Sequence, residues 1–458
     1  MIECMIAAPR SGGGKTVMTC ALLAALRQRG MNPCAFKCGP DYIDPMFHRA
    51  VLGLESHNLD LFLASADTVR TLYARYGAGH GAAVCEGVMG FYDGLGGTTD
   101  RASAWHLADT LDLPVLLVLR PKGASLTLAA TVRGLQAFRP QSHLAGILLN
   151  DCKPMLYQTL APMLERETGL PVLGYLPPME EASFASRHLG LYTAGEITDL
   201  QARVKALGIQ AQKTLDLDRI RALCSRPERP PLPDTVPVPH RTRIAVARDE
   251  AFCFCYAETL DALRDAGAEP VFFSPLRDHA LPGNCAGLYL PGGYPELHAR
   301  ALGENAVLRE AIGRLVRAGL PTVAECGGYL YLGQALEDTA GTFWPMAGVL
   351  PGQGIRTGHL VRFGYAELTA HADSLLLRTE ESLPIHAFHY WDSTQNGTAC
   401  TAHKPQSGRS WDCGFATPTL FASFAHLYWA GTPRLARRFV AAAQHYEREQ
   451  GACLHPQN

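Results

Sequence analysis

The sequence lacks the features that mark membrane, secreted and nucleic-acid-binding proteins. It has no run of about 18 apolar residues, the length at which a helix becomes a candidate membrane span. Its first residues contain no basic segment followed by a long apolar core, so no signal peptide is expected. The formal net charge of −2 provides no attraction for nucleic acid or for a membrane surface. We therefore expect a cytoplasmic globular protein that binds neither.

The sequence also lacks regular cysteine spacing, internal repeats and any zinc-ligand pattern. Its 14 cysteines are scattered, and the Cys253–Cys255 pair has no second pair at zinc-ligand spacing. Reduced thiols are expected. At 458 residues the chain exceeds one ordinary domain, and a proline-dense segment at 226–239 predicts a stiff linker. We expect one domain at 1–200, a helical segment and linker at 201–240, and a second domain at 241–450.

The chain opens with a phosphate-loop pattern. An apolar strand at 2–8 is followed by the glycine-rich segment 9–16 and then by a helix pattern to about residue 29. Pro9 stands where the strict GxxxxGK[ST] motif has its first glycine, but the order of strand, glycines and helix is that of a phosphate-binding loop. The groups expected to bind a triphosphate are the amides of Gly12, Gly13 and Gly14 and the Lys15 ammonium, with the Thr16 hydroxyl holding Mg²⁺.

Further apolar strands alternate with helix patterns through the first half. They are expected at 33–38, 81–85, 114–119 and 144–150, and this alternation predicts a doubly wound, largely parallel sheet. Lys37 lies at the end of the strand 33–38, just before an acidic loop at 39–45, which is either a ligand loop or an ordinary capped turn. Glu86 follows another strand, where a second magnesium ligand or a water-positioning group belongs.

A second α/β pattern begins at residue 243 and contains a candidate nucleophile. Cys326 lies between an apolar run at 320–324 and an apolar helix pattern, in a glycine-rich corner. A strand–turn–helix corner exposes the side chain at its apex and aims helix N–H groups at it, although many cysteines are simply small buried residues. The pair Gly292–Gly293 follows another strand and suits an oxyanion hole. The candidate bases for the thiol are His386, His389 and His426.

Together these motifs resemble the cobyrinic acid a,c-diamide synthase family, over nearly the whole chain. The family joins a dethiobiotin-synthetase-like P-loop ATP domain to a C-terminal class I glutamine amidotransferase domain. The resemblance is carried by F-K-C-G-P-D-Y-I-D-P (36–45), N-L-D (58–60), E-G-V-M-G-F-Y-D-G (86–94), S-R-H-L-G-L (186–191), A-V-A-R-D-E-A-F (245–252), F-F-S-P-L (272–276), G-G-Y-P-E (292–296) and A-E-C-G-G (324–328).

The resemblance implies a ligase that uses ATP, Mg²⁺ and L-glutamine to amidate the a- and c-acetates of a tetrapyrrole. Cys326 would release ammonia from glutamine through a glutamyl thioester, with His426 relaying the proton and amides near Gly293 and Gly327 holding the oxyanion. ATP would convert each substrate carboxylate to an acyl phosphate that ammonia attacks. The remaining residues implied are Lys37 as a second cation, Thr16, Asp41 and Glu86 as magnesium ligands, and Tyr42, Ile43 and Asp93 as substrate contacts.

Two positions depart from the family pattern. Tyr428 stands two residues after His426, where class I glutaminases usually have an acid. Because the corrinoid branch generally lacks that acid, a Cys–His dyad is implied. The segment 384–390 reads P-I-H-A-F-H-Y where the family tends to show G-H-E-F-H-Y. The missing glycine and glutamate leave a variant substrate open.

Several alternatives remain at this point. The same chemistry could act on cobyrinate, hydrogenobyrinate or nickel-sirohydrochlorin. A partitioning-ATPase-like nucleotide switch with an idle C-terminal domain is an alternative of another class, but it leaves the Cys326 corner and its candidate base unexplained. A dethiobiotin-synthetase relative predicts no glutaminase domain and is disfavoured by the second half. The sequence leaves open whether the protein is a monomer or a homodimer.

Overall fold

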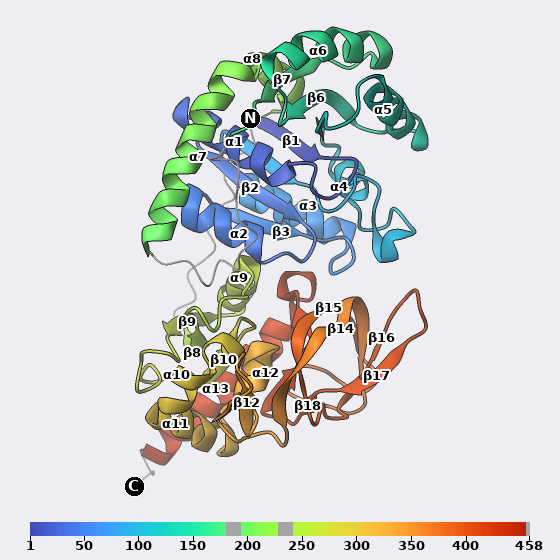
Figure 1. Ribbon diagram of the computed structural model, residues 1–458. Helices are drawn as coiled ribbons and strands as arrows, with labels where there is room; N and C mark the ends of the chain where they lie inside the picture. The colour runs from blue at the N-terminus through green and yellow to red at the C-terminus, as the bar shows by residue number, and fades with distance from the viewer. Residues whose placement is uncertain (180–193, 228–240, 455–458) are drawn as a thin grey trace. The chain divides into compact units, whose positions relative to one another are not determined.

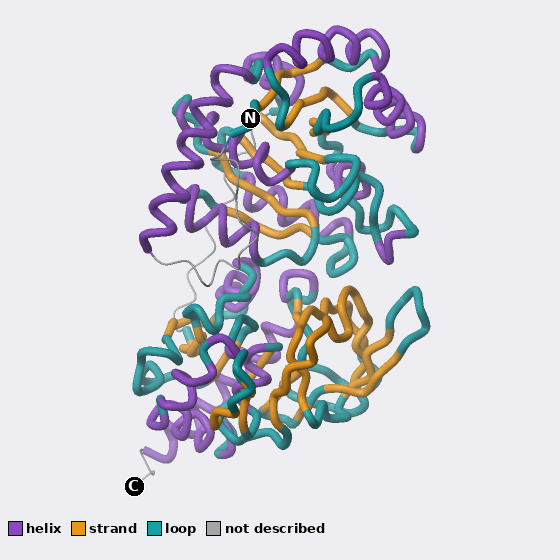
Figure 2. Tube along the Cα trace, viewed as in Figure 1, coloured by secondary structure: helices purple, strands orange, loops and turns teal. Residues whose placement is uncertain are grey.

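The computed structural model describes residues 1–179, 194–227 and 241–454, which form two compact units, Met1–Asp234 and Thr235–Asn458 (Figure 1). In each unit helices flank the strands of a sheet (Figure 2). The expected motif at 186–191 and most of the proline-dense segment lie outside the described residues. No helix in the described ranges is both long and apolar enough to cross a bilayer.

The first unit is built on a seven-stranded, all-parallel sheet of order β3-β2-β4-β1-β5-β6-β7. The strands are β1 (Ile2–Ala7), β2 (Pro33–Cys38), β3 (Ser56–Leu59), β4 (Ala82–Glu86), β5 (Val115–Leu119), β6 (Leu144–Asn150) and β7 (Val172–Leu176). The doubly wound sheet expected from the alternating pattern is confirmed. Most of the strands are predominantly apolar, as expected where helices cover both faces, although β3 reads S-H-N-L. The carboxyl ends of the strands carry the loops of the site.

The helices of this unit are α1 (Lys15–Gln28), α2 (Ile43–Phe47), α3 (Ala66–Gly77), α4 (Ala104–Leu111), α5 (Leu126–Phe138), α6 (Pro154–Thr168), α7 (Ala194–Thr214) and α8 (Leu217–Cys224), with a π-helical turn at His48–Leu52. Ser65 and Ser103 cap α3 and α4 by accepting a hydrogen bond from the backbone N–H three residues on. Helix α7 packs along α1 (Figure 1), and a Cβ on Gly208 would lie 2.8 Å from Ala24 Cβ, so glycine permits this close approach.

The second unit contains a six-stranded sheet of order β18-β19-β11-β10-β8-β9, parallel except for β18. Its strands are β8 (Thr242–Ala247), β9 (Ala268–Phe273), β10 (Gly287–Leu290), β11 (Thr322–Glu325), β18 (Phe415–Ala416) and β19 (Leu420–Ser423). The helices are α9 (Ala257–Asp265), α10 (Ala299–Glu304), α11 (Ala306–Arg317), α12 (Gly327–Leu332) and α13 (Arg434–Leu454). This sheet confirms the second α/β pattern.

A second, mostly antiparallel sheet stands beside it, which the sequence pattern did not indicate. Its strands are β12 (Ala335–Glu337), β13 (Phe343–Pro345), β14 (Gln353–Ala370), β15 (Ser382–Ser393), β16 (Cys400–His403), β17 (Ser410–Cys413) and β20 (His426–Leu427).

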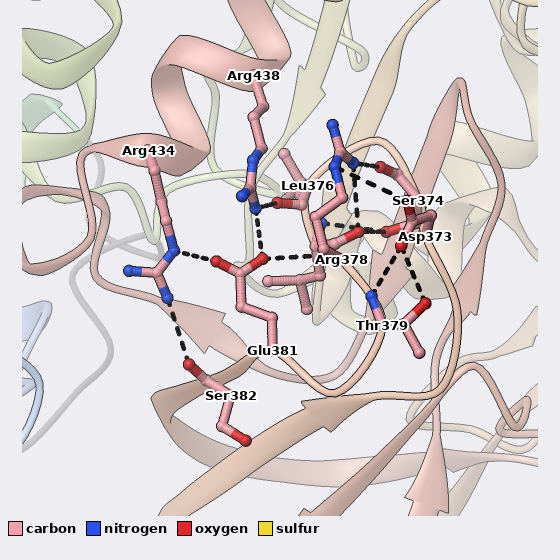
Figure 3. A network of polar contacts seen from close by, with 10 residues as sticks. Asp373, Ser374, Leu376, Arg378, Thr379, Glu381, Ser382, Arg434 and Arg438 are labelled. Carbon is pink, nitrogen blue, oxygen red and sulfur yellow. Dashed lines mark hydrogen bonds and ion pairs between the residues drawn. The ribbon is translucent and has the colours of Figure 1, made fainter.

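The loop between β14 and β15 is held to α13 by charge. Glu381 accepts hydrogen bonds from Arg434 and Arg438, and Arg438 Nη1 also donates to Leu376 O at 2.7 Å (Figure 3).

Two candidate active sites

The phosphate loop requires glycine at several positions. Gly12 and Gly14 have φ of +72° and +95°, where a side chain is strained. A Cβ on Gly13 would lie 2.8 Å from Ala8 Cβ, and one on Gly14 would lie 2.0 Å from Asn150 Nδ2. The loop therefore presents bare backbone next to the N-terminus of α1, which is the arrangement that binds phosphate.

Lys15 is the first residue of α1 and folds back over this loop. Its ammonium donates a hydrogen bond to Met89 O in the loop after β4. Burial, followed by the charge of Lys37, lowers the pKa of Lys15. A phosphate anion beside Lys15 would offset both effects, because it favours the charged form.

A cavity of about 430 Å³ adjoins the loop. Gly12, Lys15 and Thr16 form one side, and Arg120 and Asn150 lie among the residues of the other. Neither Arg120 nor Asn150 was expected from the sequence. Asn150 ends an apolar strand, where open α/β sheets bind ligands, and that position was the signal that could have found it.

Lys37 is the centre of a buried charged cluster. Its Nζ contacts Asp44 Oδ2, lies 3.0 Å from Glu86 Oε1 and 3.7 Å from Asp41 Oδ2. Burial alone would lower the pKa of Lys37, but the carboxylates of Glu86 and Asp44 raise it well above its ordinary value. Although burial opposes it, Lys37 lowers the pKa of Asp44 to about 2. The cluster joins the expected residues at 37, 41 and 86 and adds Asp44, which had been assigned no role.

The three expected magnesium ligands are brought into one region. Thr16 Oγ1 donates to Glu86 Oε1 at 2.6 Å, whereas Asp41 reaches Glu86 through Lys37. Glu86 Oε2 is buried without a hydrogen-bond partner in the described ranges, with His48 Nε2 at 3.8 Å. Burial, with the charge of Asp44, raises the pKa of Glu86 to about 7. A bound Mg²⁺ fits this set, because hydroxyl and carboxylate oxygens are its usual ligands, although no three acidic, cysteine or histidine side chains of the described residues form a metal site by themselves.

The three expected substrate contacts lie on two loops beside this cluster. Tyr42 is buried and precedes α2, and Ile43 opens that helix and packs against the core of the first unit. Asp93 is exposed, and its Oδ2 accepts a hydrogen bond from Gly90 N at 2.9 Å. Its charge raises the pKa of Lys15 slightly against the lowering effect of burial. Asp93 is thus electrostatically coupled to Lys15 of the phosphate loop, while Ile43 is partly engaged in packing.

Cys326 forms a strained corner between β11 and α12. Its backbone has φ 47° and ψ −97°, a region sparsely populated by residues with a side chain. The Cys326 amide donates to Ser423 O at 2.8 Å, and a Cβ on Gly328 would lie 2.1 Å from Leu290 O. The side chain is 5% exposed, and burial raises the pKa of the thiol well above its ordinary value. The strand–corner–helix shape is the one that the sequence predicted, but the expected exposure of the apex side chain is wrong, because neighbouring segments bury Cys326 and thereby raise its pKa instead of lowering it.

The glycine pair lies directly against this elbow. A Cβ on Gly327 would lie 3.0 Å from Gly293 N, and one on Gly293 would lie 2.1 Å from Ala251 O. Hydrogen bonds of 3.0 Å from Tyr294 N to Ala251 O and from Phe254 N to Gly292 O hold the loop in place. Two backbone segments thus approach each other beside the thiol, as an oxyanion hole needs.

The three candidate histidines occupy different places. His389 in β15 lines the small pocket that contains Cys326 and Gly293. Its Nδ1 donates to Trp391 O at 2.7 Å, and its buried Nε2 has no hydrogen-bond partner among the described residues. The ring of His426 lies against the glycine pair, because a Cβ on Gly292 would be 2.7 Å from His426 Cε1.

Burial lowers the pKa of His389 to about 4 and that of His426 to about 3, so both rings are neutral at pH 7. A neutral ring can accept a proton from the thiol. His386 pairs with His426 in register across β15 and β20.

Glu325, the residue before the nucleophile, connects the elbow to the histidine segment. Its Oε1 accepts hydrogen bonds from Tyr289 Oη at 3.1 Å and Trp429 Nε1 at 3.0 Å, and its Oε2 accepts one from Leu427 N at 3.1 Å. Burial raises the pKa of Glu325 to about 7. No role was expected for Glu325 from the sequence, although an acid between the apolar run 320–324 and Cys326 was the available signal. The carboxyl group sets the position of the segment after His426 relative to the thiol.

Comparison with known proteins covers both units. Residues 4–190 match the CobQ/CobB/MinD/ParA nucleotide binding domain, and residues 243–433 match the CobB/CobQ-like glutamine amidotransferase domain. Proteins named cobyrinate a,c-diamide synthase are similar over nearly their whole length. That of Synechococcus sp. is 38% identical over 96% of this chain and 98% of its own, that of Salmonella typhimurium is 38% identical with the same coverage, and that of Clostridium acetobutylicum is 37% identical over 96% and 100%.

Proposed function

Because this chain belongs to the cobyrinate a,c-diamide synthase family of glutamine-dependent ligases, we propose that it amidates the a- and c-acetates of cobyrinate. ATP and glutamine are the co-substrates, in line with the nucleotide-binding and glutamine amidotransferase domains. The observation that carries the proposal is the presence in one chain of a phosphate loop beside the Lys37 cluster and of the Cys326 elbow beside a glycine pair.

In the second unit Cys326 Sγ attacks the side-chain amide carbon of glutamine. The thiol proton passes through His426 to the amide nitrogen, the carbon–nitrogen bond breaks, and ammonia departs. The glutamyl thioester that remains on Cys326 is then hydrolysed by water to glutamate. The raised pKa of Cys326 means that the thiol is protonated at rest, so the base must take its proton as the attack proceeds. Backbone N–H groups of residues 293 and 327 stabilise the tetrahedral oxyanion.

In the first unit a substrate carboxylate attacks the γ-phosphorus of ATP. ADP departs as the leaving group, and the carboxylate becomes an acyl phosphate. Ammonia then attacks the carbonyl carbon and displaces phosphate, which yields the amide. The loop amides of residues 12–14 and the Lys15 ammonium hold the phosphates. The carboxylates of Asp44 and Glu86 keep the Lys37 ammonium in place near the phosphates. Thr16, Asp41 and Glu86 would hold Mg²⁺, which neutralises phosphate charge when bound.

Tyr42, Ile43 and Asp93 are the proposed contacts for the tetrapyrrole. They lie on the loops that follow β2 and β4, beside the Lys37 cluster. Two loops at neighbouring strand ends suit a large flat substrate whose carboxylate must reach the phosphate loop.

The test uses the full chain with ATP, Mg²⁺ and glutamine, and cobyrinate, hydrogenobyrinate and nickel-sirohydrochlorin in parallel. Mass spectrometry is expected to show two successive acid-to-amide changes on cobyrinate. The Cys326→Ala variant should lose glutamine-dependent synthesis but keep synthesis from added ammonium salt. Amidation of another tetrapyrrole would correct the substrate alone. ATP hydrolysis that depends on neither glutamine nor a tetrapyrrole would contradict the proposal and support a nucleotide switch.

A further inference from the structure

The pocket of Cys326 contains a carboxylate that the reaction above does not use. Glu296 lies in the 3₁₀ turn Pro295–Leu297, three residues after Gly293, and lines the pocket together with Cys326. No hydrogen bond or ion pair within the described ranges joins its carboxylate to another residue, and its own backbone N–H is its contact. Glu296 is half-buried. An unpaired carboxylate this close to a nucleophile needs an explanation, because carboxylates withdrawn from water are normally paired.

The position of Glu296 is unfavourable for the nucleophile in the absence of a cation. After burial, the charge of Glu296 is the largest contribution that raises the pKa of the Cys326 thiol. Burial likewise raises the pKa of Glu296 to about 7. Each anion therefore opposes the other, so a positively charged group in the pocket would favour both.

The pocket wall itself provides no such cation. No lysine or arginine lines it, and His389 is neutral because burial lowers its pKa to about 4. The substrate of a glutaminase does carry one. Glutamine has an α-ammonium group at one end and the reactive amide at the other. A carboxylate beside the thiol is complementary to the ammonium end of the molecule whose amide the thiol attacks.

We propose that Glu296 binds the α-ammonium group of glutamine, so that the site selects glutamine over amides that lack this group. The inference rests on the glutaminase role proposed above and identifies a specificity-determining residue for it. Binding also pairs the carboxylate, which removes its repulsion from the Cys326 thiolate. The thiolate of Cys326 is thus favoured when glutamine is bound.

The experiment compares glutamine with glutaramate, which has hydrogen in place of the α-amino group. Glutaminase kcat and KM are measured for the full-length wild type, Glu296→Gln and Glu296→Asp, with the urea unfolding midpoint of the second unit, followed by tryptophan fluorescence, as the control for folding. In Glu296→Gln we expect kcat/KM for glutamine to fall on the order of 10²-fold, mainly through KM, since a charged partner of a polar substrate group is lost. Its kcat/KM for glutaramate should change by less than about 3-fold. Glu296→Asp keeps the charge and should retain most of the preference.

A second readout tests the repulsion between the Glu296 carboxylate and the Cys326 thiolate. Alkylation of Cys326 by the neutral reagent iodoacetamide, followed by mass spectrometry of its peptide, should be faster in Glu296→Gln than in wild type, because one repulsive charge is absent. Equal losses for both substrates in Glu296→Gln, or an unchanged preference for glutamine, would overturn this inference and leave the ligase function standing. A wild type without glutaminase activity would instead overturn the proposed function and this inference together.

Discussion

Replacement of Glu325 by alanine should remove the hydrogen bonds that connect the Cys326 elbow to the segment 427–429, which follows His426. The variant removes the acceptors of three hydrogen bonds, those from Tyr289, Leu427 and Trp429. A buried donor left without an acceptor costs about 1–3 kcal/mol, so three would cost about 3–9 kcal/mol. Water that enters the vacated space would satisfy some of them, and we expect a loss of about 3–5 kcal/mol in the second unit.

Urea unfolding followed by tryptophan fluorescence measures this loss. Four of the five tryptophans, at 344, 391, 411 and 429, belong to the second unit, so the signal reports mainly on it. Glu325→Gln is the matched control. It keeps one carbonyl oxygen for Tyr289 and Trp429 and turns an amide N–H₂ toward Leu427 N, so it should lose about 1–2 kcal/mol.

Glutaminase activity provides the functional measurement. The segment that Glu325 holds begins next to His426, and a misplacement of about 1 Å between reacting groups costs about 10²-fold in rate. We expect glutaminase kcat to fall by that order in Glu325→Ala, with ammonia-dependent amidation retained because the first unit is unchanged. A Glu325→Ala variant with the wild-type urea midpoint and the wild-type kcat would refute this reasoning.

Three further outcomes are expected. Lys37→Met leaves the neighbouring carboxylates without their cation and should destabilise the first unit by about 3–5 kcal/mol in thermal or urea unfolding, whereas unchanged stability would contradict the charged cluster. Gly14→Ala should weaken ATP binding at least about 10-fold by calorimetry, since its Cβ meets Asn150 at a strained φ; Gly12→Ala, whose Cβ meets nothing within 4 Å, should cost less. Burial raises the pKa of Glu325 in the folded protein to about 7, from an ordinary value of about 4.3. Protonation of Glu325 therefore stabilises the folded second unit at low pH, and this contribution is lost as pH rises through 7. Because Glu325→Gln cannot titrate, its urea midpoint should decline less between pH 5 and 8 than that of the wild type.

The parallel sheets could be predicted because continuous apolar runs, turns and helix patterns alternate along the chain. The phosphate loop and the Cys326 elbow were predictable for a similar reason, since each is a local strand–turn–helix motif. The antiparallel sheet was missed. Strand β14 alternates buried and less buried positions only over its last five residues, and its pairing with β15 shifts register twice, so most of it shows no period of two. Strand β15 does alternate, with Leu383, Ile385 and Ala387 buried, and this signal was overlooked.

The supporting residues of both sites were missed for a different reason. Glu325 acts on partners at 289, 427 and 429, and Asn150 meets the phosphate loop from a strand more than a hundred residues away. Such roles exist only after the strands are assembled. Asp44 was inside a recognised motif, but its contact with Lys37 depends on the turn that α2 makes. Motifs locate a site, whereas the contacts that tune it come from tertiary structure.

The strained backbone of Cys326 has a consequence for how such chains diverge. A non-glycine residue at φ 47° and ψ −97° costs on the order of 1–3 kcal/mol, and glycine there would relieve most of it. Selection for stability and selection for catalysis therefore oppose each other at this position. In a lineage supplied with free ammonia the second pressure disappears, and substitution of Cys326 by glycine would be favoured twice, by the lost requirement and by the recovered stability. Residue 326 is therefore the position at which relatives that depend on free ammonia should first be sought.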